Sequence, residues 1–235
     1  MSERDAAMTK PDQGDGSVSA MTWTERAADR SPLMQQWRSR NVRQMKIMVD
    51  AAKRLIAQKG SSFTTQELAR EAGVALQTFY RHFGGKDQLL LAVIEDLHAE
   101  MAVEYEAAAR DLPDPLARLH YYVTTILAGL DGTGPDAESP RFITGEHWRL
   151  HQIFPDEMAL ATQPTVDLFA REIRAAQQQG LIAVDDVTHS AELMVMLVRA
   201  VYHQYAFARK NEPVAAIAEH VWEFCLQGIG RPHHP

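Results

Sequence analysis

Hydrophobic side chains recur every three or four positions along most of the chain, which is the spacing of one face of an α-helix. The first such run contains Met45, Met48, Ala52 and Leu55, and Gly60 is expected to cap the end of that helix. No stretch alternates between hydrophobic and polar residues for long enough to predict a strand. The pattern therefore predicts an all-α fold of about nine helices.

Two short helices are predicted after Gly60. Thr64 and Glu67 have the spacing of a capping box, in which each side chain satisfies a free backbone donor at a helix start. Gly73 is expected to end the first short helix, and Gly84-Gly85 the second. A long helix over residues 86–109 would then extend about 36 Å, at 1.5 Å per residue.

The rest of the chain predicts further helices separated by turns. They are expected after Pro115, over residues 142–154 and 156–179, from residue 185 or 186 to about Arg209, and from Pro213 to Gly228. Pro164 is expected to kink or divide the third of these. Residues 1–35 lack periodicity and predict a disordered tail. We expect residues 36–88 and 89–230 to form two domains.

Charge is distributed unevenly between these parts. Residues 36–90 contain ten Lys or Arg and four Asp or Glu, a net charge of +6, whereas the whole chain carries −7, which leaves −13 elsewhere. Such asymmetry indicates that a polyanion would be attracted to one end of the molecule and repelled by the rest. Solvated surfaces of opposite sign are the alternative interpretation.

Composition narrows the class of protein. No stretch of 18 apolar residues exists to cross a membrane, and no signal sequence precedes the first helix. The single cysteine, Cys225, excludes an internal disulfide and a paired-cysteine metal site. These features predict a reduced, cytoplasmic protein with no membrane partner.

Residues 64–83 have the layout of a helix-turn-helix, a DNA-binding unit whose second helix enters the major groove. Leu68, Ala69, Val74, Phe79 and Phe83 are the expected packed face. The remaining polar side chains are then free to face outward, as a helix that contacts base edges requires.

This segment resembles the DNA-binding domain of TetR-family regulators. The likeness rests on the run Thr64-Thr65-x-x-Leu68-Ala69-x-x-Ala72-Gly73-Val74, followed by Thr78-Phe79-Tyr80-x-His82-Phe83-x-x-Lys86-x-x-Leu89, and extends over residues 47–91. The sequence departs from the family pattern at Ala75, where a capping Ser is common, and the missing cap would cost about 1 kcal/mol.

The resemblance implies roles for individual side chains. Thr64 and Thr65, at a helix N-terminus, would hold a phosphate, and Tyr80, His82 and Lys86 would also contact the DNA backbone. Base contacts would come from the side chains Gln66, Leu76, Gln77, Thr78 and Arg81. Arg43 and the nearby Arg38 and Arg40 either form a basic arm on the DNA or are simply solvated.

The last two predicted helices are rich in hydrophobic residues on more than one face. Residues 193–198 read LMVMLV, and Val214, Ile217, Val221 and Phe224 recur along the final helix. A helix that is apolar all round must be covered all round. The resemblance implies a homodimer formed through these two helices, which would place two recognition helices on one double-stranded operator. A monomer with a thick core is the alternative.

The resemblance also implies that the protein is a regulator rather than an enzyme and that it needs no cofactor. It further implies a repressor that is released from DNA when a small-molecule effector binds. The middle helices supply a mixture of aromatic, apolar and polar residues typical of a pocket for an uncharged or weakly polar hydrophobic effector. The candidates are His120, Tyr121, Tyr122, Thr125, Phe142, His147, Trp148, His151, Phe154, Phe169, Met194 and His203.

A competing hypothesis places an enzymatic or metal site on Glu146, His147 and His151. The two histidines are four residues apart, on one helical face, as a zinc pair would be, but a third ligand would have to come from elsewhere. The order of the residues does not match the zinc-protease motif, so no metal is expected. A module that binds another protein through its apolar helices is the other competing class.

Overall fold

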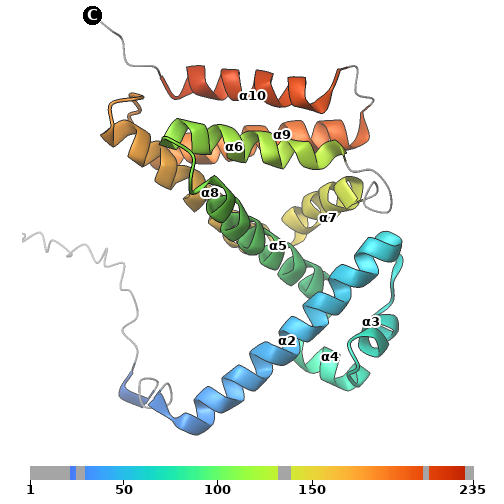
Figure 1. The fold of residues 1–235 in the computed structure, drawn as a ribbon. Coiled ribbons are helices and arrows are strands. Elements are labelled where there is room, and N and C mark those ends of the chain that lie inside the picture. Colours follow the sequence, from blue (N-terminus) through green and yellow to red (C-terminus); the bar gives the residue numbers. More distant parts are fainter. Residues whose placement is uncertain (1–21, 25–29, 132–138, 209–211, 231–235) are drawn as a thin grey trace, which may run out of the picture. The chain divides into compact units, whose positions relative to one another are not determined.

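The computed structural model describes residues 22–24, 30–131, 139–208 and 212–230. Across these ranges it contains nine α-helices, two short 3₁₀ turns and no strand, as the hydrophobic pattern predicts (Figure 1). The helices are α2 (Pro32–Lys59), α3 (Thr65–Glu71), α4 (Leu76–His82), α5 (Lys86–Ala109), α6 (Pro115–Ala128), α7 (Ser139–Ile153), α8 (Pro155–Gln178), α9 (Val187–Phe207) and α10 (Val214–Gly228). None of these helices is long and apolar enough to cross a membrane.

The chain separates into two compact units, residues 1–43 and residues 44–235. In the first unit, α2 begins at Pro32, so the end of the expected disordered tail is helical; most of the remaining tail lies outside the described residues. Residues 132–138 and the end of the chain after residue 230 also lie outside them.

The helix-turn-helix forms as its local signals predict. Gly60 and Gly73 adopt positive φ values of 61° and 65°, which only glycine accepts without strain. Thr64 accepts a hydrogen bond from the backbone of Glu67, whose side chain accepts one from the backbone of Thr64, so the capping box is present. Ala75 caps α4 without a side-chain hydrogen bond. This short helix is therefore held by packing rather than by its N-terminal cap.

Pro164 lies inside α8, which continues through it without division. Of the two outcomes expected for this proline, division of the segment does not occur, and a kink stays a prediction. Proline removes one backbone donor, and the carbonyl that loses its partner belongs to Leu160, four residues earlier. Leu160 is exposed on the helix surface, where water satisfies that carbonyl at little cost.

Two hydrophobic clusters build the core of the second unit. The lower cluster joins the helix-turn-helix to the beginning of α5, and also contains Leu150 of α7 with Met158 and Ala161 of α8. The upper cluster is built by α6, α8, α9 and α10, around Tyr122 and Phe169. Burial of these side chains is the main stabilising contribution to both clusters, and a cavity lies between α5, α7, α8 and α9.

Candidate functional site

The helix α4 has one buried face and one exposed face. Phe79 is fully buried, and its ring packs against those of Tyr80 and Phe83 at centroid distances of 5.0 and 5.9 Å. Gln77 and Arg81 are exposed on the other side. Leu76 and Thr78 are partly buried, and the Thr78 hydroxyl accepts a hydrogen bond from Arg81 at 3.5 Å. This arrangement leaves α4 rigid on one side and rich in polar groups on the other.

The N-terminus of α3 lies beside the exposed face of α4. Thr64 and Gln66 are exposed, and the Thr65 hydroxyl lies 3.3 Å from the hydroxyl of Tyr80, which is half exposed. The hydroxyl groups of Thr64, Thr65 and Tyr80 therefore lie at one edge of the two helices. A helix N-terminus with such donors favours an anion such as a phosphate.

Two of the predicted phosphate contacts are engaged within the protein. His82 hydrogen-bonds Gln44 of α2 at 3.0 Å. Lys86 donates to the Phe63 carbonyl at 2.7 Å and lies 4.3 Å above the Phe63 ring, where burial lowers the pKa of its ammonium group. Both side chains thus help to position the helix-turn-helix, whatever they contact outside it. Arg43 is exposed and belongs to the unit of residues 1–43.

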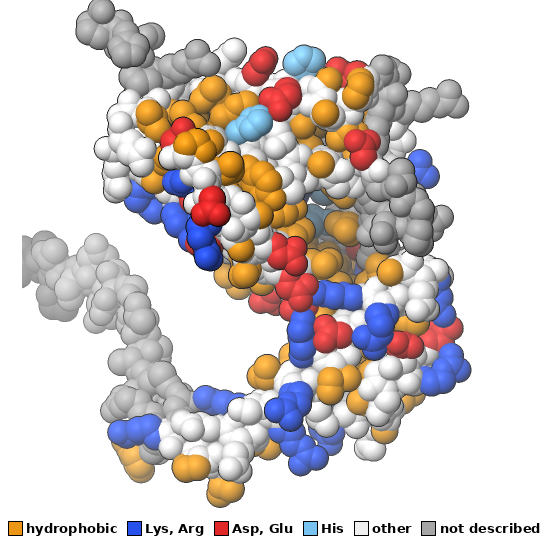
Figure 2. Space-filling view, viewed as in Figure 1, with side chains coloured by type: hydrophobic (Ala, Val, Ile, Leu, Met, Phe, Trp, Pro, Cys, Tyr) orange, Lys and Arg blue, Asp and Glu red, His pale blue; other side chains and the backbone are white. Residues whose placement is uncertain are grey.

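Several of the basic residues are neutralised by acidic neighbours. Lys46 and Lys53 of α2 both pair with Asp96 and Glu100 of α5. Lys59 pairs with Glu67 at 2.6 Å, which together with the Thr64 backbone lowers the pKa of that carboxyl to about 2. Lys and Arg side chains gather over α2–α4 with Asp and Glu among them (Figure 2). The excess positive charge seen in the sequence is therefore partly balanced by α5.

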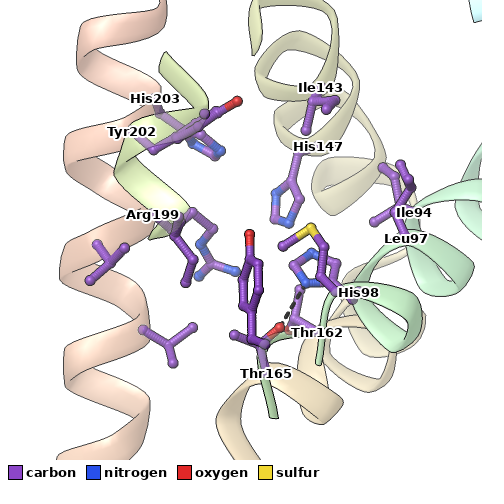
Figure 3. Close-up of a pocket in the computed structure, with 16 residues that line it drawn as sticks. Ile94, Leu97, His98, Ile143, His147, Thr162, Thr165, Arg199, Tyr202 and His203 are labelled. Carbon is purple, nitrogen blue, oxygen red and sulfur yellow. Dashed lines mark hydrogen bonds between the residues drawn. The ribbon is translucent and has the colours of Figure 1, made fainter. Parts of the chain in front are cut away.

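A cavity of about 230 Å³ opens between α5, α7, α8 and α9. Its wall is mainly apolar, with Ile94, Leu97, Met101, Val195 and Val198 among the residues that line it. The polar groups are three histidines, two threonines, two tyrosines and one arginine: His98, His147, His203, Thr162, Thr165, Tyr105, Tyr202 and Arg199 (Figure 3). An apolar body with a few polar contacts is the ligand that such a wall accepts.

The histidines come from three different helices. The His147 ring lies 5.4 Å from that of His203 and 6.1 Å from that of His98, and His98 Nδ1 lies 2.9 Å from the Thr165 hydroxyl. Burial, assisted by the charge of Arg199, lowers the pKa of His147 to about 3 and of His98 to about 4, and also lowers the pKa of His203. All three imidazoles are therefore neutral at pH 7.

The structure brings two of the predicted effector contacts, His147 and His203, to this cavity. Trp148 and His151 point outward, with Trp148 66% exposed. His120 is bound to Glu219, and the side chain of Phe142 lies outside the described residues. The others pack in or against the hydrophobic clusters or are partly buried on α6: Tyr121, Tyr122, Thr125, Phe154, Phe169 and Met194. Met194 also borders a groove between α9 and α10.

Sequence reasoning missed two polar groups of the cavity, His98 and Arg199. His98 lies on the long helix α5, to which the sequence analysis assigns no ligand contact, and Arg199 lies on α9, which it assigns to the dimer interface. Arg199 could have been singled out from the sequence, because it is a lone charge directly after the apolar run of residues 193–198. A charge within a buried helix is rarely placed there without a partner.

The alternative site on Glu146, His147 and His151 is not assembled. Glu146 accepts hydrogen bonds from Arg149, His147 is buried and His151 is exposed. Within the part of the chain that the structure describes, no three His, Cys, Asp or Glu side chains are grouped as a metal site would require.

The helices α9 and α10 border a groove in two adjoining parts, which share Leu197 and Phe224. One part of the groove, about 460 Å³, is lined by Leu193, Met196 and Phe224 together with smaller residues. Its neighbour runs along Leu197 and Val201. Leu193, Met196 and Phe224 are each at least half exposed. Large apolar side chains gathered along a groove mark an interaction surface.

The family described as "Bacterial regulatory proteins, tetR family" matches residues 48–93, which include the whole helix-turn-helix and the beginning of α5. Residues 48–93 therefore form a DNA-binding segment of the TetR type. The resemblance of residues 47–91 noted in the sequence is thereby confirmed.

Two curated regulators are similar to the chain over the same part of the sequence. The HTH-type transcriptional regulator BetI of Brucella canis is 38% identical over 73 residues, which are 31% of this chain and 37% of BetI. The Bacillus subtilis regulator YvaF is 50% identical over 48 residues, 20% of this chain and 25% of YvaF. The chain thus matches little more than a third of the length of BetI and a quarter of the length of YvaF.

Solved structures extend the likeness of fold to most of the chain. FadR of Thermus thermophilus, a repressor in complex with lauroyl-CoA, has a TM-score of 0.65 at 19% identity, covering 81% of this chain and 97% of its own. RolR in complex with resorcinol has a TM-score of 0.64 at 15% identity, covering 83% and 91%. At such identities the likeness concerns the fold alone.

Proposed function

We propose that this protein is a transcriptional regulator that binds double-stranded operator DNA as a homodimer and is released by a small effector. One observation carries the proposal: a helix-turn-helix with a fully packed inner face and an exposed row of donors and acceptors, built on the segment that matches the family. In this proposal residues 36–88 bind DNA and residues 89–230 bind the effector and form the dimer.

The exposed groups divide into two kinds of contact. Thr64, Thr65 and Tyr80 would hold phosphates and set the register of the protein on the duplex. Gln77 and Arg81, exposed on α4, would contact base edges, since Gln suits adenine and Arg suits guanine. Lys86 would add a phosphate contact next to the carbonyl of Phe63 that it already holds.

Arg81→Ala tests this division. We expect the variant to lose about 1–3 kcal/mol of preference for its operator over unrelated DNA, because a base-contacting guanidinium is removed while phosphate contacts remain. Fluorescence anisotropy with DNA from the protein's own upstream region and with a scrambled duplex measures both affinities at one salt concentration. Arg174→Ala, an exposed arginine of α8, is the matched control. Equal preference in Arg81→Ala and the parent would contradict the proposal.

The homodimer would bury the groove between α9 and α10. A partner's α9 and α10 would cover the exposed Leu193, Met196 and Phe224, and a twofold axis would place two copies of α4 on one face of the DNA. Such an interface explains why large hydrophobic side chains remain exposed on the two helices.

Phe224→Glu is expected to reduce the mass of the protein in solution from that of a dimer, twice 26.4 kDa, to that of a monomer. The reason is that a carboxylate would be buried without a partner in the interface. DNA affinity should fall by about tenfold or more, since only one half-site is then held at a time. Light scattering gives the mass and anisotropy the affinity. Leu160→Glu, at an equally exposed position of α8, should remain dimeric. A parent protein that is monomeric at micromolar concentration would contradict the dimer.

The effector would act by shifting a population of conformations. It must bind the DNA-incompetent arrangement more tightly, and it shifts the equilibrium only by that difference in affinity. The complexes of FadR with lauroyl-CoA and of RolR with resorcinol support an effector with an apolar body. In this proposal the protein works by binding rather than catalysis, in the cytoplasm, where bacterial DNA is accessible.

A further inference from the structure

Arg199 is the polar group of the cavity that lacks a matching charge. The cavity lining, as far as the structure describes it, contains no Asp or Glu, and burial lowers the pKa of the Arg199 guanidinium. Arg118, another arginine of the same helical region, pairs with the buried carboxylate of Glu172 at 2.7 Å. The chain thus supplies a counter-ion for one arginine and leaves the charge of the other directed at the cavity.

The imidazoles opposite Arg199 have unused hydrogen-bonding capacity. His147 is 5% exposed, and its Nε2 atom has no hydrogen-bond partner among the described residues. His98 uses Nδ1 on the Thr165 hydroxyl, which leaves its other nitrogen available. Arg199 lies on one side of the cavity, with His147 and His98 on the other (Figure 3). Leaving a buried polar atom unpaired destabilises the folded protein, so a ligand that pairs with this atom is favoured.

We propose that the effector of this cavity is a hydrophobic monocarboxylate, whose anionic group pairs with Arg199 and accepts a hydrogen bond from His147. The proposal rests on the proposed function and specifies its effector class. It replaces the expectation of an uncharged effector with one that has an apolar body and a single negative charge.

The number of charges selects the anionic group. The cavity offers one full positive charge, because its three histidines are neutral, and an arginine fork matches the two oxygens of a carboxylate. A phosphate ester with two negative charges would bring one charge more than the site neutralises, and burying an uncompensated charge is costly. The apolar wall of Ile94, Leu97, Met101 and Val198 would contact the hydrocarbon body.

Isothermal titration calorimetry on the full chain without DNA tests the proposal with two matched pairs of probes. These are octanoate against octan-1-ol, and 3-phenylpropionate against 3-phenylpropan-1-ol, at pH 7.5. We expect at least one acid to bind at least about tenfold more tightly than its alcohol, the effect of one charge-assisted contact. Arg199→Gln should remove that difference, and Arg199→Lys should retain part of it because it keeps the charge.

Control variants separate a lost contact from a lost fold. Arg174→Gln, on the exposed surface of α8, should bind the acids like the parent, and thermal melts followed by circular dichroism identify any variant that fails to fold. Three results would overturn the proposal: the alcohols bind as tightly as the acids, folded Arg199→Gln keeps the preference for the acid, or neither acid binds at 10 mM. That concentration is about ten-thousandfold above a Kd of 1 μM. Since DNA is absent, failure of acid binding leaves the anisotropy test of the proposed function unaffected.

Discussion

Phe79→Ala is expected to lower the free energy of unfolding by about 3–5 kcal/mol, the usual cost of removing a fully buried aromatic ring. Phe79 is 0% exposed and is the buried anchor of α4, a seven-residue helix with no side-chain cap at its N-terminus. Isolated helices of this length are not stable in water. Loss of the ring should therefore release α4 from α2 and α3 and abolish specific DNA binding.

Urea unfolding followed by circular dichroism measures the loss of stability, and anisotropy with operator DNA measures the loss of binding. Trp148→Ala removes a ring of at least equal size from a position that is 66% exposed, and it should change the free energy of unfolding by no more than about 0.5 kcal/mol. If Phe79→Ala unfolded at the same urea concentration as Trp148→Ala, the packing described for α4 would be wrong.

Acidification should destabilise the protein before its carboxylates titrate, because the buried histidines resist protonation. In the unfolded chain a histidine takes up its proton near pH 6.5, whereas in the folded protein His98 and His147 do so near 4 and 3. Between these values the unfolded state binds more protons, so the free energy of unfolding falls as the pH falls below about 6.5. Above pH 6.5 both histidines are neutral in the folded and the unfolded protein, and their contribution to the free energy of unfolding is fully present. At pH 4 the free energy of unfolding is lower by an amount on the order of 3 kcal/mol for each histidine.

His147→Gln isolates this effect, because the amide keeps a polar group in place but does not titrate. The groups that face His147 are Arg199 and His203 of α9 and His98 of α5. Urea midpoints measured from pH 7.5 to 5.0 should fall less steeply in the variant than in the parent. His151→Gln, exposed one helical turn later, should retain the parent's slope. Equal slopes for all three proteins would contradict the assignment.

Local signals in the sequence predicted the helix-turn-helix closely. The capping box at Thr64 and the glycines at 60 and 73 act over three or four residues, so their outcome depends little on the rest of the fold. The long helix was likewise bounded by Gly85 before it, and it occupies residues 86–109 as predicted.

The cavity was harder to predict because its wall is set by how the helices pack. His147 and Trp148 are adjacent in the sequence and equally plausible as ligand contacts, yet one is buried and the other exposed. A rotation of 100° separates consecutive residues on a helix, and only the packing of α7 against α9 decides which of them faces inward. For the same reason the sequence did not predict that Arg199 lines the cavity, because its apolar neighbours indicated a dimer interface.

Ile94 belongs both to the cavity wall and to a hydrophobic cluster. It lines the cavity, and it is part of the lower cluster that contains Phe79 of α4 and Leu150 of α7. Closely packed interiors transmit displacement because they have almost no free volume. An effector that displaces Ile94 is therefore expected to disturb the cluster that holds α4 in place.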